Sequence, residues 1–220
     1  MNAKAVLKQI DEVYSRLIST NLSVKQFFPS VNQSLGKITR IGSLSGGSIA
    51  LRDLSYEEIY SEIESNNSYH IKLPDGGLLI FQYMFDNTET LEKHRLSYFP
   101  SSVLPTFDEA PTLYENDELY GDVVRNALVR FPIRFDYDPA AHQELTHPKS
   151  HLTLGQYENC RIPVESAVSP HVFMMFLLRN FYFRCYQRNK NKLERKPPYI
   201  GVQSSITAKE RRVLHLVNGM

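Results

Sequence analysis

The chain has few of the features that mark a secreted, membrane-bound or disulfide-stabilised protein. Only two of its 220 residues are cysteine, which excludes a disulfide scaffold and a zinc site made of four cysteines. Its longest apolar run, Val172 to Leu178, is far shorter than the ~20 residues of a membrane-spanning helix. Residues 1–20 mix charged and apolar positions and lack the apolar run of a secretory signal. We therefore expect a cytoplasmic protein with no membrane partner.

Phosphate-loop and repeat patterns are missing as well. The glycine-rich stretch from Gly42 to Ser48 does not end in the Lys-Ser or Lys-Thr pair of a P-loop, so we interpret it as a turn. Neither a solenoid-type repeat nor a low-complexity tract is visible. Hydrophobic residues make up 42% and charged residues 22% of the chain, a composition that does not fit intrinsic disorder.

The charge of the chain is balanced in total but uneven along its length. Its 25 Lys and Arg residues against 24 Asp and Glu residues give a net charge of +1, which by itself disfavours a nucleic-acid binder. The sum hides six acidic residues and no basic residue between Thr106 and Asp122, and seven basic residues with one acid between Arg179 and Lys196. A basic face of this size is typical of phosphate binding, although basic residues also complement the dipole at a helix end. The residues predicted to bind nucleic acid are Arg184, Arg188, Lys190, Lys192, Arg195 and Lys196.

Hydrophobic periodicity and capping residues predict helices near both ends of the chain. Apolar residues at three- and four-residue intervals predict an amphipathic helix over 4–19. A capping box of Ser55 and Glu58 predicts a short helix to about residue 65. The pair Ser169-Pro170 is typical of a helix start, and this helix is expected over 171–189 with its first half buried.

Turn residues and β-branched segments predict strands between these helices. The Pro-Asp-Gly-Gly turn after Leu73 predicts a β-hairpin. Near the end of the chain, Thr207 with Glu210 forms another capping box, although 211–217 equally fits an edge strand. Strands are expected within 36–51 around Gly46-Gly47, and over 69–73, 78–85, 92–99, 128–137, 152–156 and 161–164.

This order of elements predicts an α+β fold. Because neighbouring strands are joined by tight turns, we expect a mainly antiparallel β-sheet with an N-terminal helix and a long buried helix near the C-terminus. Strict β-α-β alternation is missing, which disfavours a doubly wound fold. We predict a single domain over 1–220, with a candidate sub-boundary at the acidic loop 100–122.

The densest group of chemically active side chains lies between residues 134 and 161. Three of them occupy alternate positions of a predicted strand, so they point to one face of the sheet. Two histidines follow on a stretch that Pro148 keeps from being helical, and a period of two places them on one side. A hairpin between neighbouring strands would bring Arg161, which begins the next strand, close to these three strand residues and the two histidines. The predicted catalytic residues are Arg134, Asp136, Asp138, His147, His151 and Arg161.

Three interpretations of this cluster remain open from sequence. In a metal-independent, ribonuclease-like site one histidine is the general base, the other the general acid, and arginine stabilises the charge on a phosphate. Alternatively, Asp136, Asp138 and the histidines hold a divalent manganese, iron or zinc ion that activates water. In the third, Asp-Tyr-Asp-Pro is only a turn and the histidines are loop residues. The cofactor prediction is therefore none or one divalent metal.

Two further pairs of residues are weaker candidates. His94 and Arg95 could reach the same pocket, although such a pair is more typical of an exposed surface. Cys160 and Cys185 lack the flanking pattern of a nucleophile, and we expect buried thiols.

Five short segments follow one another in an order that is found in a known family. They are 94–100 (HRLSYFP), 134–139 (RFDYDP), 147–152 (HPKSHL), 161–164 (RIPV) and 170–182. Together they resemble an uncharacterised bacterial family, the domain of unknown function 2290 (DUF2290). The resemblance implies a bacterial, cytoplasmic protein and a gene neighbourhood of defence or toxin–antitoxin systems, and it implies no activity. Asp-Tyr-Asp followed by a His-rich segment is also similar to small bacterial toxin families of nuclease type.

The leading hypothesis is a toxin-like or defence-associated nuclease, in which the basic helix end positions phosphates at the cluster. The alternative is a non-catalytic, partner-binding subunit of a defence or toxin–antitoxin complex. Its cluster would be a structural polar network, and its charged segments would dock a neighbour-encoded protein. A nuclease predicts a cluster that faces a cleft flanked by Arg161, whereas a binding subunit predicts a buried cluster saturated by backbone hydrogen bonds.

Overall fold

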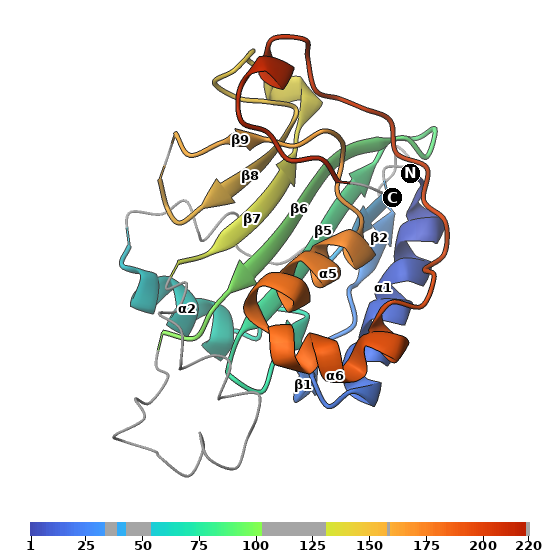
Figure 1. The fold of residues 1–220 in the computed structure, drawn as a ribbon, viewed down its shortest axis with the longest axis vertical. Helices are drawn as coiled ribbons and strands as arrows, with labels where there is room; N and C mark the ends of the chain where they lie inside the picture. The colour runs from blue at the N-terminus through green and yellow to red at the C-terminus, as the bar shows by residue number, and fades with distance from the viewer. Residues whose placement is uncertain (34–38, 43–53, 103–130, 158, 219–220) are drawn as a thin grey trace.

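The computed structural model describes residues 1–33, 39–42, 54–102, 131–157 and 159–218 (Figure 1). Within them the protein is of the α+β class: an antiparallel sheet carries helices α1, α5 and α6 on one side. The predicted Gly46-Gly47 turn, and most of the acidic loop with its candidate boundary, lie outside the described residues.

A single sheet contains the nine strands of the described residues, and every strand pairing among them is antiparallel. Its main order is β1-β4-β5-β6-β7-β8-β9, while β3 pairs with β5 and with β2. The strands are β1 (Lys25–Gln26), β2 (Val31–Gln33), β3 (Thr39–Ile41), β4 (Ile71–Lys72), β5 (Leu78–Phe85), β6 (Leu91–Phe99), β7 (Ile133–Tyr137), β8 (Ser150–Leu154) and β9 (Ile162–Pro163).

The predicted hairpin is present between β4 and β5. Gly76 adopts a φ of +85°, which an L side chain rarely tolerates, and its N–H donates to the carbonyl of Leu73 at 2.9 Å. The N–H of Gly77 donates to Oδ1 of Asp75 at 3.0 Å. The turn residues thus provide both the backbone conformation and the hydrogen bonds that the hairpin needs.

The helices begin where the capping residues predicted, but the last long one is broken. The helices are α1 (Ala3–Ser19), α2 (Tyr56–Ser65), α5 (Pro170–Phe181) and α6 (Phe183–Leu193). Ser55 and Glu58 form the full capping box of α2, and Ser169 caps α5. The single helix expected over 171–189 is interrupted at Tyr182, whose φ of −128° and ψ of 44° leave the helical region.

The interruption at Tyr182 has a cause distant in sequence. Its hydroxyl donates to Oδ2 of Asp75 at 2.6 Å and lies 2.8 Å from the hydroxyl of Tyr98 on β6. These buried contacts hold the side chain against the sheet, and the far end of α6 reaches α1. There, the guanidinium of Arg16 donates to the carbonyl of Leu193 at 3.0 Å.

Near the C-terminus each of the two expected structures is present in part. The reciprocal bonds of the capping box join Thr207 and Glu210, but they open only the 3₁₀ turn η3 (Glu210–Arg212). Leu216 then forms an isolated parallel bridge with Val164, next to the sheet edge.

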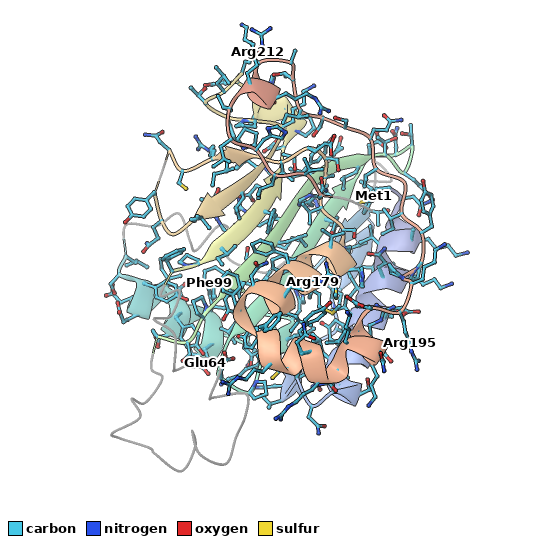
Figure 2. All side chains as sticks on the ribbon, in the orientation of Figure 1. Met1, Glu64, Phe99, Arg179, Arg195 and Arg212 are labelled. Atoms are coloured by element: carbon cyan, nitrogen blue, oxygen red, sulfur yellow. The ribbon has the colours of Figure 1, made fainter. Side chains whose placement is uncertain are left out.

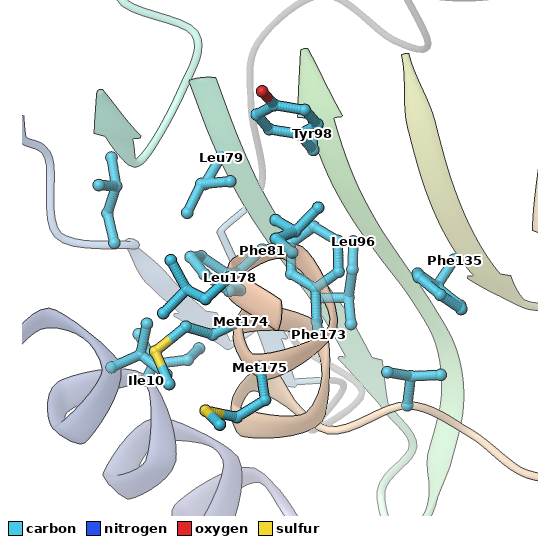
Figure 3. Packing of buried hydrophobic residues seen from close by; sticks show 14 of the residues in the cluster. Ile10, Leu79, Phe81, Leu96, Tyr98, Phe135, Phe173, Met174, Met175 and Leu178 are labelled. Atoms are coloured by element: carbon cyan, nitrogen blue, oxygen red, sulfur yellow. The ribbon is translucent and has the colours of Figure 1, made fainter. Parts of the chain in front are cut away.

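The core lies between the sheet and α1 with α5 (Figure 3). Phe173 of α5 packs edge-on against Phe81 of β5 and Phe135 of β7, with ring centroids 5.9 and 6.1 Å apart. We call this side of the sheet the core face. On the opposite side, Ile59 and Ile63 of α2 cover only one end, over Leu78, Ile80 and Phe99.

The buried carboxylate of Asp75 gives a prediction about stability. Burial raises the pKa of Asp75, and Asp75 is 5% exposed. Because a raised folded pKa favours the protonated form, stability from this group is present at low pH and is lost as pH rises through that pKa. Asp75→Asn should therefore raise the free energy of unfolding at pH 8 by about 1 kcal/mol and flatten its pH dependence. Urea unfolding between pH 4 and pH 9 measures both effects.

The matched control is Asp75→Ala. It leaves the N–H of Gly77 and the hydroxyl of Tyr182 without their acceptor, and we expect a loss of about 2–3 kcal/mol. In Asp75→Asn the amide oxygen still accepts from Gly77, and the amide N–H can donate to Tyr182. If the asparagine variant were as unstable as the alanine variant at pH 8, the carboxylate would be needed in its ionised form and the prediction would fail.

Candidate functional site

The predicted cluster lies on the sheet face opposite the core face. Arg134 and Asp136 alternate on β7 with Phe135, which packs against α5. The register pairs Asp136 with Arg95 of β6 on one side and with His151 of β8 on the other. The prediction that alternate positions of this strand share a face is therefore confirmed. We call the following residues the polar face: Lys93, Arg95, Arg134, Asp136, Asp138, His147, His151 and Arg161.

Asp136 is the centre of the polar face. Its side chain is 9% exposed, and its Oδ1 accepts a hydrogen bond from Nε of Arg95 at 2.7 Å. Nε of Arg134 and Nε2 of His151 each lie 3.9 Å from its Oδ2. Burial acts to raise the pKa of Asp136, but the charges of Arg95 and Arg134 outweigh it and keep the pKa below its usual value. Asp136 is therefore an ionised carboxylate.

Arg134 is the residue of the polar face whose hydrogen bonding is least satisfied. It is 6% exposed, and its buried Nε and Nη1 atoms have no hydrogen-bond partner. Burial lowers its pKa, the charge of Asp136 opposes this, and Arg95 and Arg161 add to the lowering. Leaving buried charged donors unused costs free energy, and such groups in proteins normally bind a partner. The guanidinium is therefore suited to donate hydrogen bonds to a bound oxyanion.

His147 and His151 form a pair beside Asp136. Their ring centroids are 5.0 Å apart in an edge-to-face arrangement. Nδ1 of His151 lies 2.9 Å from the carbonyl oxygen of Pro148, which can only accept, so the neutral ring has its proton on Nδ1 and a lone pair on Nε2. Burial lowers the pKa of both rings, and the charge of Arg161 further lowers that of His147. Both imidazoles are therefore neutral at neutral pH.

The rim of the cluster is more open to solvent than its centre. Asp138 forms an ion pair with Nζ of Lys93 at 2.5 Å. Arg161 is partly exposed, and its Nη1 donates to the carbonyl of Thr146 at 3.3 Å. His147 is also partly exposed, whereas His151 is 3% exposed. The cluster thus has a buried base and a partly exposed rim that includes Arg161.

Sequence reasoning grouped His94 with Arg95, and the structure separates them. Arg95 belongs to the polar face, where it is the closest partner of Asp136. His94 points to the core face and is 1% exposed, and its Nε2 accepts from the N–H of Val168 at 2.9 Å. Burial lowers the pKa of His94 to about 4. The signal for Arg95 and for the missed Lys93 was the two-residue alternation of β6, which sequence alone could not align with β7.

The six basic residues predicted to bind nucleic acid are exposed on α6 and on the residues that follow it. Figure 2 shows Arg195 beside the end of α6, in the same helical layer as Arg179 of α5. Because this layer covers the core face, the structure does not bring these residues to the polar face. The hypothesis that the basic helix end positions phosphates at the cluster gains no support from this arrangement, and the six residues stay a prediction. The acidic residues 108–122 lie outside the described residues.

Cys185 is buried as expected, whereas Cys160 is only partly buried. In the part of the chain that the structure describes, no three His, Cys, Asp or Glu side chains are grouped so that they could hold a metal ion. The metal-dependent interpretation therefore has no ligand set there and stays a prediction.

Comparison with known proteins shows the family to which the chain belongs. A family model described as "Uncharacterized conserved protein (DUF2290)" matches residues 22–218. Neither a curated protein nor a solved structure matches the chain. Among the residues described, none of the helices has the length and apolarity that crossing a membrane requires. The match includes every residue of the polar face, and its description gives no activity.

Proposed function

Because the chain belongs to the DUF2290 family of uncharacterised conserved proteins, we propose a function from the geometry of its polar face: metal-independent cleavage of RNA phosphodiesters. The observation that carries the proposal is the buried guanidinium of Arg134, whose Nε and Nη1 have no partner beside a pair of neutral histidines. A phosphate oxygen would supply the missing acceptor, and the histidines would transfer protons on either side of it.

The charge of the polar face supports binding of a phosphate. Lys93, Arg95, Arg134 and Arg161 contribute four positive charges, and Asp136 and Asp138 contribute two negative ones. With neutral imidazoles the face thus has a net charge of +2, so an incoming anion reduces the repulsion between the buried Arg134 and the more exposed cations around it. Arginine is well suited to this role because its planar guanidinium can bind two phosphate oxygens at once.

The two histidines support a proton-transfer mechanism. Nε2 of His151 would accept the proton of a ribose 2′-hydroxyl as its oxygen attacks phosphorus, and Oδ2 of Asp136, 3.9 Å away, would stabilise the resulting imidazolium. The bond from phosphorus to the 5′-oxygen breaks, and this oxygen takes a proton from the protonated form of His147, which is the minor form at neutral pH because the pKa of His147 is lowered. The products are a 2′,3′-cyclic phosphate and a free 5′-hydroxyl. Because the nucleophile is part of RNA, this route needs no metal-activated water and does not act on DNA.

Substitution of both histidines tests the proposal. His147→Ala with His151→Ala should reduce cleavage of a fluorogenic RNA oligonucleotide by about 10³-fold or more, since each proton transfer contributes about 10²–10⁴-fold. The assay is run with a chelator at pH 6, on the acidic side of neutrality, because the general acid must be protonated while its pKa is lowered.

The matched control is His215→Ala, a histidine outside the polar face that is expected to leave cleavage unchanged. A DNA oligonucleotide of the same sequence should stay intact. Undiminished RNA cleavage by a double variant with native circular dichroism and thermal unfolding would overturn the proposal, as would the absence of chelator-resistant cleavage by the unaltered protein.

The partner-binding subunit is the second candidate, and a specific observation favours it. Asp136 and His151 are buried, and they are already bonded to Arg95 and to a backbone carbonyl. A purely structural network of this kind predicts that the double histidine variant loses stability, with no RNA cleavage to lose. Such a subunit should also co-purify with a neighbour-encoded protein of a defence or toxin–antitoxin system.

A further inference from the structure

A cavity of about 780 Å³ lies in the helical layer, away from the polar face. Its walls are α5, the segment from Lys196 to Val202, and residues Val217 and Asn218 near the C-terminus. Cavities that hold small molecules measure about 300–1,000 Å³. The cavity is therefore large enough for a small-molecule ligand.

One part of the cavity lining is apolar. Val172, Met175 and Phe176 contribute it from α5, and Val202 contributes it from the facing segment. Met175 is buried, while Val172 and Phe176 are only partly buried and so retain surface that a ligand could cover. An apolar ligand body placed there would remove this surface from water.

The polar part of the cavity lining includes a neutral histidine. His171 lines the cavity, and its Nδ1 accepts a hydrogen bond from Nη1 of Arg16 at 3.1 Å, so the neutral ring has its proton on Nε2. Burial and the charge of Arg16 lower the pKa of His171 to about 4, which keeps the ring neutral. His171 therefore offers an N–H donor to a ligand.

Positive charge exceeds negative charge at one end of the cavity. Arg179 and Lys196 line it, and Glu194 is the one carboxylate in the lining that the structure describes. Oε1 of Glu194 lies 2.8 Å from Nη2 of Arg179, and its Oε2 lies 3.9 Å from Nζ of Lys190, so the carboxylate forms ion pairs with two cations. Arg179 nevertheless keeps 55% of its side chain exposed. This end is therefore complementary to an anionic group.

We propose that this cavity binds a small amphipathic carboxylic acid. The apolar body lies against Val172, Met175 and Phe176, and the carboxylate lies at the end formed by Arg179 and Lys196. The site is independent of the polar face and of the RNA-cleavage proposal.

Displacement of a fluorescent probe tests the site. The probe is 1-anilinonaphthalene-8-sulfonate, which combines an apolar body with an anionic group and fluoresces when it leaves water. We expect saturable binding to the full chain and displacement by decanoate. Decanol has the same apolar chain without the charge, and it should compete at least tenfold more weakly.

Variants locate the site in the cavity. Val217→Trp fills the cavity from a residue that is 66% exposed, and it should weaken probe binding at least tenfold. Leu214→Trp is the matched control, because Leu214 is 81% exposed and does not line the cavity. Arg179→Gln and Lys196→Gln should each weaken decanoate about three- to fivefold, as expected for exposed ion pairs, and Lys8→Gln should have no effect.

Three outcomes would overturn the proposal. They are the absence of saturable probe binding, equal competition by decanol and decanoate, and equal effects of Val217→Trp and Leu214→Trp. None of them bears on RNA cleavage, which the histidine variants test separately.

Discussion

Replacing Arg134 by methionine is expected to reduce RNA cleavage by about 10²–10³-fold while leaving the fold as stable as before, or more stable. The guanidinium is the group that would bind the scissile phosphate, and removal of one such charge-stabilising donor from an active site has effects of this size. Methionine has a similar length and no charge, and the substitution removes two buried nitrogen atoms that have no hydrogen-bond partner. Asp136 keeps its hydrogen bond to Arg95, so removal of the buried, unbonded donors of Arg134 should raise the free energy of unfolding by about 1 kcal/mol. Cleavage rates, titration with inorganic phosphate and urea unfolding measure the three effects.

Arg212→Met is the control for Arg134→Met. Arg212 lies in the exposed turn η3, so its loss should change neither activity nor stability by a measurable amount. A clear loss of stability in Arg134→Met would mean that the guanidinium is a satisfied structural group, and this result would favour the binding subunit over the nuclease.

Replacing Asp136 by alanine is expected to have the opposite effect on stability. Arg95 would lose its hydrogen bond to Oδ1 of Asp136, and Arg134 and His151 would each lose a carboxylate oxygen that lies 3.9 Å away. Breaking a buried ion pair from one side typically costs about 3–5 kcal/mol, because the remaining charge is left uncompensated. Since Arg95 keeps 25% of its side chain exposed, we expect the lower end of this range, about 3 kcal/mol, in urea unfolding at pH 7.

The pH dependence of this effect has a definite sign. The pKa of Asp136 is lowered in the folded protein, so its contribution is present above the unfolded pKa and is lost as pH falls through the folded pKa. The difference between the unaltered protein and Asp136→Ala should therefore shrink below about pH 4. A difference that stays constant into the acid range would show that the carboxylate charge is not its source.

Combining the two substitutions separates charge from packing. If the cost of Asp136→Ala comes largely from the stranded Arg134, Arg134→Met should raise stability by clearly more in the Asp136→Ala background than the about 1 kcal/mol expected from it in the unaltered protein. Additive effects in the double variant would instead assign the cost to Arg95 and to the cavity left by the carboxylate.

Local pattern was sufficient for much of the fold and for part of the site. The two-residue period placed Arg134 and Asp136 on one face, and the turn residues that end at Gly77 located the hairpin. Capping residues marked the starts of α2 and α5. These features depend on residues close together in sequence, which is why they could be predicted.

What could not be predicted depends on contacts between distant residues. The pairing of Arg95 with Asp136 requires the register of β6 against β7, which no local pattern determines. The break at Tyr182 requires Asp75, and the separation of the basic helix end from the polar face depends on which side of the sheet α5 covers. The unpartnered nitrogens of Arg134 likewise became visible only in three dimensions.

The hydrogen bond between Tyr182 and Asp75 also affects how parts of the protein unfold locally. It joins residues 107 positions apart, and it connects the hairpin turn directly to the corner between α5 and α6. Neither segment can expose its amides to solvent without breaking this contact, so the two should exchange hydrogen as one cooperative unit. Contacts between residues so distant in sequence also slow folding.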